Sequence, residues 1–245
     1  MVMLLLGDRF APITSSIALL NTDIELVVER FVEWMQAIEL KYGRKVEVRS
    51  RSFSGLLPDA LTQLLPLTSV EIRRHLFVST SANWTAYFNN AWRGTDTGSY
   101  MHYMPQVLQC KGVQLTAIPD TIQDYGNTFK GRWGATILGV HSHQSTGLLN
   151  LDRLIQLIHE PSGWNFRQLG IPYKFENLQA YERRIIQSRF TLEMLRSYLL
   201  ELGLTPFQEE FYTISDDQPA LLVEKIGETN PSLVEYSLAK ARSDF

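Results

Sequence analysis

The sequence predicts an α+β fold in which helices pack on a largely antiparallel sheet, formed as a single domain of residues 1–245. Three observations predict it. Runs of β-branched and aromatic residues come in pairs joined by short polar links, which is typical of hairpins. Three segments show the three- and four-residue apolar spacing of amphipathic helices. A regular alternation of strand and helix, which would favour a parallel sheet, does not occur.

The first helix is expected over residues 22–43. Thr22 is a candidate N-cap, and Glu25 completes a capping box with it. The apolar residues that follow recur at helical spacing: Ile24, Val27, Val28, Phe31, Val32, Met35 and Ile38. A strand is expected next, over residues 45–53, because Val46 and Val48 alternate with charged residues.

A hairpin of residues 74–80 and 84–92 follows, since only Ser81, Ala82 and Asn83 separate the two runs. Residues 99–109 carry apolar side chains at helical spacing, with Pro105 inside the segment and Gly112 as a candidate stop. Further strands are expected at residues 113–118, 133–140 and 220–226. Residues 151–159 fit a strand or a short helix, and the turn at residues 161–163 favours a second hairpin over residues 151–166. Further helices are expected at residues 175–186, 191–202 and 232–241, the second of them stopped by Gly203.

The sequence contains no linker rich in Gly, Ser or Pro and no internal repeat, which favours one domain. The alternative is two small α+β lobes that divide near Gly147. A chain of this length buries roughly 70–75% of the surface of its unfolded form, so its core needs no metal or disulfide.

Composition excludes several classes of protein. The chain is 44% hydrophobic and 20% charged, which is not typical of a disordered or collagen-like protein. The single cysteine, Cys110, cannot form an internal disulfide and is expected to be a small buried side chain. The apolar start at residues 1–6 is too short for a signal-peptide core, and no stretch approaches the roughly 20 apolar residues of a membrane span. We therefore expect a cytoplasmic location and no membrane partner.

The charge balance gives no sign of a nucleic-acid partner. The chain has 23 basic and 26 acidic residues, a net charge of -3 and no run of five like charges. It also lacks a Gly-rich phosphate loop with Lys and a Gly-x-Ser-x-Gly nucleophile elbow. We expect no cofactor.

A paired histidine motif offers the one candidate metal site. His141 and His143, at i and i+2 on an expected strand, project to one side, and Asp152 follows as a candidate third ligand. The motif resembles part of the zinc-binding pattern of JAMM-type isopeptidases, which implies a metal-dependent hydrolase. It departs from that pattern at Gln144, where the pattern has Pro, and in the shorter spacing to Asp152. The plainer interpretation is a polar strand exit with two surface histidines.

An aromatic and polar segment, residues 83–96, offers a candidate surface for a protein partner. Alternation sends Tyr87 to one face of the strand and Trp92 to the other. If the Tyr87 face is exposed, or Trp92 together with Arg93 and Asp96 at the strand exit, these residues suit an interface anchor. The alternative is that the Trp side chains are buried in the core.

Several segments resemble bacterial proteins that have no assigned activity, some of them suspected immunity or accessory partners of secreted toxins. These segments are residues 83–96, 162–166, 175–176, 181–184 and 189–212. The shared motifs are a hairpin turn, a helix start and a helix stop. The resemblance implies no catalytic residue.

Three functions are therefore open. We favour a non-enzymatic bacterial protein that binds another protein, with toxin neutralisation as one such role. The alternative is a metal-dependent hydrolase that uses His141, His143 and Asp152. A third possibility is a small-molecule-binding protein whose pocket is lined by Trp and Tyr.

Overall fold

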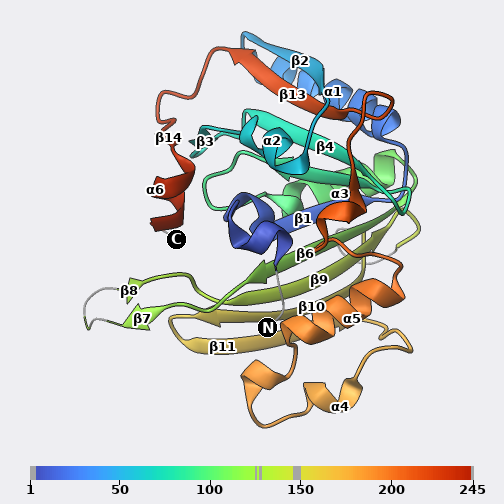
Figure 1. The fold of residues 1–245 in the computed structure, drawn as a ribbon, viewed down its shortest axis with the longest axis vertical. Coiled ribbons are helices and arrows are strands. Elements are labelled where there is room, and N and C mark those ends of the chain that lie inside the picture. Colours follow the sequence, from blue (N-terminus) through green and yellow to red (C-terminus); the bar gives the residue numbers. More distant parts are fainter. Residues whose placement is uncertain (1–3, 125, 127–128, 146–149, 244–245) are drawn as a thin grey trace.

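The computed structural model describes residues 4–124, 126, 129–145 and 150–243. Ten of the strands within these residues form one sheet, which runs through the whole molecule (Figure 1). Across the sheet the order is β11 (Gly163–Gly170), β10 (Leu151–Glu160), β9 (Ala135–Ser142), β6 (Lys111–Ile118), β1 (Ser16–Leu20), β5 (Thr85–Asn89), β4 (Arg74–Thr80), β13 (Ala220–Gly227) and β2 (Val46–Phe53). The tenth strand, β12 (Tyr212–Thr213), pairs with the end of β4. Every pairing in this sheet is antiparallel, which confirms the predicted α+β class.

Two short strand pairs stand apart from the large sheet. The first joins β3 (Leu67–Thr68) to β14 (Glu235–Tyr236), and the second joins β7 (Gln123–Asp124) to β8 (Phe129–Lys130). The β3–β14 pair holds the C-terminal region beside the hairpin of β4 and β5, because the β3 residue Thr68 also forms a bridge to Ala91.

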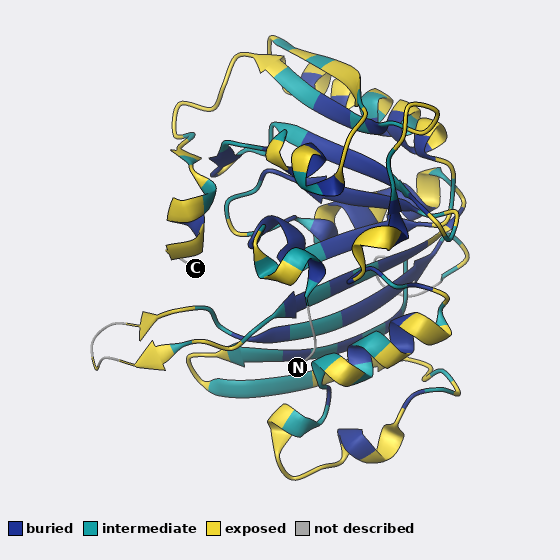
Figure 2. Cartoon of the chain, viewed as in Figure 1, coloured by how far each residue is buried: buried dark blue, intermediate teal, exposed yellow. Residues whose placement is uncertain are grey.

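Helices cover both faces of the sheet (Figure 1). On one face lie α1 (Ile24–Lys41) and α3 (Thr97–Val107), whose buried side chains share a core with β1, β4, β5 and β13. The other face carries a larger core, to which α2 (Leu57–Thr62), α4 (Leu178–Tyr181), α5 (Leu192–Glu201) and α6 (Leu238–Ser243) contribute. The central strands are therefore buried on both sides (Figure 2).

Alternation along the central strands divides their side chains between the two cores. Phe77 of β4 and Tyr87 of β5 belong to the core under α1 and α3, whereas Leu76 and Phe88 belong to the opposite core. This explains why β4 reads as a continuous apolar run and β2, at the sheet edge, as an alternating one. Both predicted hairpins are confirmed.

Some helix boundaries differ from the prediction. Asp23, not Thr22, is the N-cap of α1, because its carboxylate accepts from the backbone N–H groups of Glu25 and Leu26. Gly112 does not stop α3 but lies in β6, where a Cβ would overlap with Met101 of that helix. Because Gly112 has no side chain, α3 can approach the sheet closely.

The helix predicted over residues 175–186 is wrong except for the short α4. The reason is tertiary: the Glu176 carboxylate is drawn into the core, where it pairs with Arg153 of β10 (Nη2 to Oε2, 2.6 Å). Glu176 also accepts from the Tyr173 backbone N–H and the Tyr181 hydroxyl. These bonds fix the segment against the sheet in a form that a continuous helix cannot adopt.

The prediction for the C-terminal region was also too long, because the helix expected over residues 232–241 begins at Leu238, after β14. The alternative domain boundary, Gly147, lies outside the described residues, and β9 and β10 on either side of it pair directly in the one sheet. Within the part of the chain that the structure describes, no helix combines the length and the apolar character needed to cross a bilayer.

Candidate functional site

The predicted metal ligands His141, His143 and Asp152 are not placed in the structure to bind one metal ion. His141, at the end of β9, is fully buried and its ring lies 6.2 Å from that of His102 on α3. His143 follows in a turn beyond the strand, and Asp152 stands where the pairing of β10 with β9 is irregular. Among the described residues, no group of three or more His, Cys, Asp or Glu side chains is placed to hold a metal ion. A metal centre at these residues has no geometric support there.

The predicted partner-binding residues are separated by the fold. Tyr87 is 2% exposed, so the expectation of an exposed Tyr87 face is wrong, because α1 and α3 cover that face of β5. Trp92 is half-buried and stacks on Tyr236 of β14, with ring centroids 4.8 Å apart. Arg93 is exposed, and its guanidinium lies 4.7 Å from the centroid of the Trp92 ring. Asp96 is the N-cap of α3.

A cleft of about 360 Å³ lies between α1, α3 and the sheet, and we consider it the candidate functional site. Its lining residues come from five stretches of the sequence: Phe31, Trp34, Met35, Ile38 and Arg44; Val70, Glu71, Ile72 and His75; Tyr87; Asp96, Ser99 and Tyr100; and Lys225. We call it the aromatic cleft. Tyr87 and Asp96, which the sequence suggested for a protein partner, are among its walls.

Each element brings its residues to the aromatic cleft for a local reason. Helical spacing places Phe31, Trp34 and Met35 on neighbouring positions of the α1 face that meets the sheet. The antiparallel pairing of β4 with β5 places His75 and Tyr87 on the same face of the sheet, on neighbouring strands. The Asp96 carboxylate, by accepting from the Ser99 backbone N–H, starts α3 so that its first turn presents Tyr100.

Aromatic rings form the inner wall of the aromatic cleft. Tyr87 and Tyr100 stack with centroids 4.0 Å apart and ring planes 9° apart. Phe31 lies 4.7 Å from the His75 ring and 6.0 Å from both tyrosine rings. Trp34, nearer the outside, stacks on Tyr103 at 4.8 Å. Such packing fixes ring positions without polar contacts.

Two buried polar atoms of this wall have no hydrogen-bond partner among the described residues: Nε2 of His75 and the hydroxyl of Tyr100. His75 is 4% exposed and Tyr100 2% exposed. An unsatisfied buried polar group costs roughly 1–3 kcal/mol. Buried polar groups are nearly always paired, so these two atoms, in residues that line one cleft, call for a partner that is not among the described residues, either an ordered water or a ligand.

The hydrogen bonds around Tyr87 favour one tautomer of His75. Asn89 Oδ1 accepts from the backbone N–H groups of Ala91 and Asp96, which leaves its Nδ2 to donate to the Tyr87 hydroxyl (3.0 Å). The Tyr87 hydroxyl proton is then available to His75 Nδ1, 2.9 Å away. This arrangement favours the His75 tautomer that carries its proton on Nε2, where the ring is then a donor.

Burial keeps these groups uncharged. Desolvation, with a smaller contribution from the positive charge of Lys225, lowers the pKa of His75 from 6.5 to about 3. Desolvation likewise raises the pKa of Tyr87 and of Tyr100 above the ordinary value of a phenol. At neutral pH the inner wall therefore offers neutral imidazole and phenol groups.

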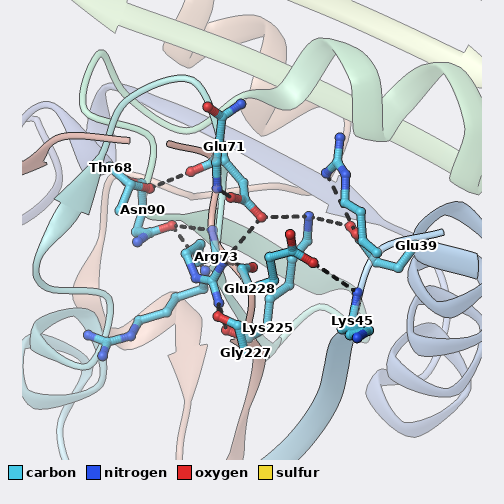
Figure 3. A network of polar contacts seen from close by, with 12 residues as sticks. Glu39, Lys45, Thr68, Glu71, Arg73, Asn90, Lys225, Gly227 and Glu228 are labelled. Atoms are coloured by element: carbon cyan, nitrogen blue, oxygen red, sulfur yellow. Dashed lines mark hydrogen bonds and ion pairs between the residues drawn. The ribbon is translucent and has the colours of Figure 1, made fainter. Parts of the chain in front are cut away.

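Figure 3 shows a chain of ion pairs to which the cleft-lining residues Lys225 and Glu71 belong. Lys225 Nζ lies 2.8 Å from Glu39 Oε1 and 3.7 Å from Glu71 Oε1. Arg44 approaches Glu39 (3.6 Å), and Arg73 approaches Glu71 (3.3 Å). The Lys225, Glu39 and Glu71 side chains are each less than a tenth exposed. Buried ion pairs add little net stability, because the cost of desolvating the charges offsets their attraction.

Comparison of the chain with protein-family models, with curated proteins and with solved structures finds no match. The class is therefore defined by the fold and the site alone: an α+β protein with one large antiparallel sheet and an aromatic cleft beneath two helices on one face. The resemblance to uncharacterised bacterial proteins stays a prediction.

Sequence reasoning missed most of the aromatic cleft, although two signals were present. Glu39 continues the buried stripe of Phe31 and Met35 on α1, where an apolar residue is the norm. Lys225 stands near the end of a strand that is otherwise mostly apolar. A charged residue at a position that the pattern assigns to the core indicates a paired or functional group.

Proposed function

We propose that this chain is a non-enzymatic binding protein whose aromatic cleft takes up a small organic molecule. The observation that carries the proposal is the pair of unpartnered polar atoms, His75 Nε2 and the Tyr100 hydroxyl, on the lining of an aromatic cleft. Binding sites for small molecules are typically concave and mostly apolar, with a few polar groups that orient the ligand. This cleft has that composition.

The chemistry of the surrounding groups supports binding rather than catalysis. His75 is a poor base because burial lowers its pKa to about 3. Cys110 lies in the same core, but burial raises the pKa of its thiol to about 11, so it is not a ready nucleophile. Lys225 is already paired with two carboxylates.

The test is a screen of small organic molecules by thermal unfolding, on protein without an affinity tag, with Tyr100→Phe as the variant. Molecules that bind the aromatic cleft raise the melting temperature of the wild type and raise that of Tyr100→Phe less, because one polar contact is lost. Tyr103→Phe is the matched control, since Tyr103 is exposed and does not line the cleft. Absence of any hit, or hits that respond equally to both variants, contradicts the proposal.

A protein partner is the second function that we propose, on a different surface. It is supported by the stack of Trp92 on Tyr236 with the Arg93 guanidinium over the Trp92 ring, a rigid aromatic and cationic platform beside an exposed loop. Toxin neutralisation remains one such role. Pull-down from the native host, repeated with Trp92→Ala and Arg93→Ala, tests it. Retained capture by both variants, with the fold intact by circular dichroism, removes this surface from consideration.

A further inference from the structure

We infer that the ligand of the aromatic cleft is an uncharged, flat molecule of one or two fused aromatic rings that carries a hydrogen-bond acceptor. The inference rests on the proposed small-molecule function and names the class of ligand. Four features of the cleft lead to it: the shape of its walls, the pairing of its charges, its volume and the proton on His75.

The walls select a flat molecule. Three aromatic side chains, Phe31, Tyr87 and Tyr100, meet at the inner end, and Trp34 lies on the cleft lining nearer the outside. Aromatic side chains interact best with other aromatic rings, by stacking or edge to face, with about 0.5–1.5 kcal/mol beyond the buried area. An aliphatic ligand would gain only the area term.

The charges on the cleft lining are already neutralised within the protein. Lys225 and Arg44 both approach Glu39, Glu71 is held by Arg73 as well as by Lys225, and Asp96 caps the N-terminus of α3. A charged ligand would need an unpaired opposite charge to offset its desolvation. The lining has two basic and two acidic residues, so no excess of either sign is present.

The volume limits the size of the ligand. At about 360 Å³ the aromatic cleft is near the small end of the range for organic ligands. One ring or two fused rings fit such a space, and a dinucleotide or a large cofactor does not.

The proton on His75 sets the polarity of the contact. Because Tyr87 donates to Nδ1, His75 Nε2 is an N–H donor without a partner among the described residues. A ring nitrogen or a carbonyl oxygen on the ligand would accept a hydrogen bond from this N–H group. The Tyr100 hydroxyl can donate to the same group or to a second one.

The experiment compares three probes of closely similar ring shape: quinoline, which is neutral at pH 7.5 and has a ring nitrogen, naphthalene, which has no acceptor, and 2-naphthoate, which is charged. Dissociation constants come from ligand-observed NMR on the full chain. We expect quinoline to bind at least tenfold more tightly than naphthalene, and 2-naphthoate to bind more weakly than quinoline. In His75→Phe the preference for quinoline over naphthalene should fall, and in the double variant with Tyr100→Phe, which removes both donors, it should fall to within about twofold.

A measurement on the wild type guards against a His75 variant that does not fold. A histidine ¹H–¹⁵N correlation spectrum reports which ring nitrogen is protonated, and we expect the Nε2-protonated form for His75. Protonation on Nδ1 overturns the inferred polarity of the ligand.

The outcomes separate this inference from the proposed function. Equal affinity for quinoline and naphthalene, or preference for 2-naphthoate, overturns the ligand class but leaves a small-molecule function standing. Failure of all three probes, while other molecules from the thermal screen bind and respond to Tyr100→Phe, has the same meaning. Failure of every molecule in that screen overturns both.

Discussion

The Tyr100 hydroxyl allows a test of the aromatic cleft in which the sign of the effect is informative. Tyr100→Phe removes one oxygen that is buried and has no partner among the described residues. Since such a group costs roughly 1–3 kcal/mol to bury, we expect the free energy of unfolding of the ligand-free variant to rise by about 1 kcal/mol. For a chain of this size that change raises the melting temperature by roughly 2–4 °C.

Tyr212→Phe is the matched control for this prediction. Tyr212 is also buried, but it lies in the opposite core and its hydroxyl donates to the Pro206 carbonyl oxygen at 2.8 Å. The same chemical change there removes a hydrogen bond and leaves a buried acceptor, so we expect the free energy of unfolding to fall by about 1–3 kcal/mol. The two tyrosines should therefore respond with opposite signs.

Urea unfolding followed by circular dichroism measures both effects, with the slope of free energy against urea as the check that the unfolded states are comparable. A Tyr100→Phe variant that is destabilised as much as Tyr212→Phe refutes the reasoning. Its hydroxyl would then have a partner within the protein, and the case for a ligand at this position would lose its main observation.

Three further predictions concern His75, the buried ion pair and α3. Burial lowers the pKa of His75 from 6.5 in the unfolded chain to about 3 in the native protein. Between these two pH values the imidazole is protonated in the unfolded chain and neutral in the native protein, so the free energy of unfolding falls as the pH falls. Between pH 7 and 5 the wild type should lose about 2 kcal/mol more than His75→Phe in urea unfolding, and equal losses contradict the burial of a neutral ring. Arg153→Met or Glu176→Leu alone should lower the free energy of unfolding by about 3–5 kcal/mol, because each leaves one buried charge without its partner. The double variant should lose less than the sum of the two single losses, and a strictly additive loss in the same urea assay argues against coupling of the pair. Gly112→Ala should cost about 1 kcal/mol, because a Cβ displaces the flexible end of the buried Met101 side chain and tightens the contacts with Pro105 and Leu20. Gly98→Ala, within α3 and without such an overlap, should be neutral or stabilising, and similar melting temperatures for the two variants contradict the close approach of α3 to β6.

Local patterns were sufficient to predict the class of fold. The hairpin of β4 and β5 and that of β10 and β11 follow from short polar links between β-rich runs, and α1 and α5 follow from apolar spacing with a capping residue. These signals depend on neighbours in the sequence, so the sequence contains them in full.

The errors arose where a distant residue decides the local structure. Glu176 leaves a helical pattern because its carboxylate pairs with the buried Arg153 guanidinium of β10. Tyr87 is covered because α3 returns over β5, which no alternation along β5 can reveal. The aromatic cleft is of the same kind: His75 and Lys225 come together through the pairing of β4 with β13, and Tyr100 joins them through the packing of α3 on the sheet.

The division of β4 and β5 between two cores limits how this protein can change over time. Consecutive side chains of these strands face opposite sides, so inserting or deleting one residue would exchange the cleft-facing set for the set that packs under α5. His75 and Tyr87 can therefore be replaced singly, whereas a shift of their strands would destroy both layers together. The lining of the cleft can therefore change by substitution in the two strands, whereas a change of length has to fall outside them.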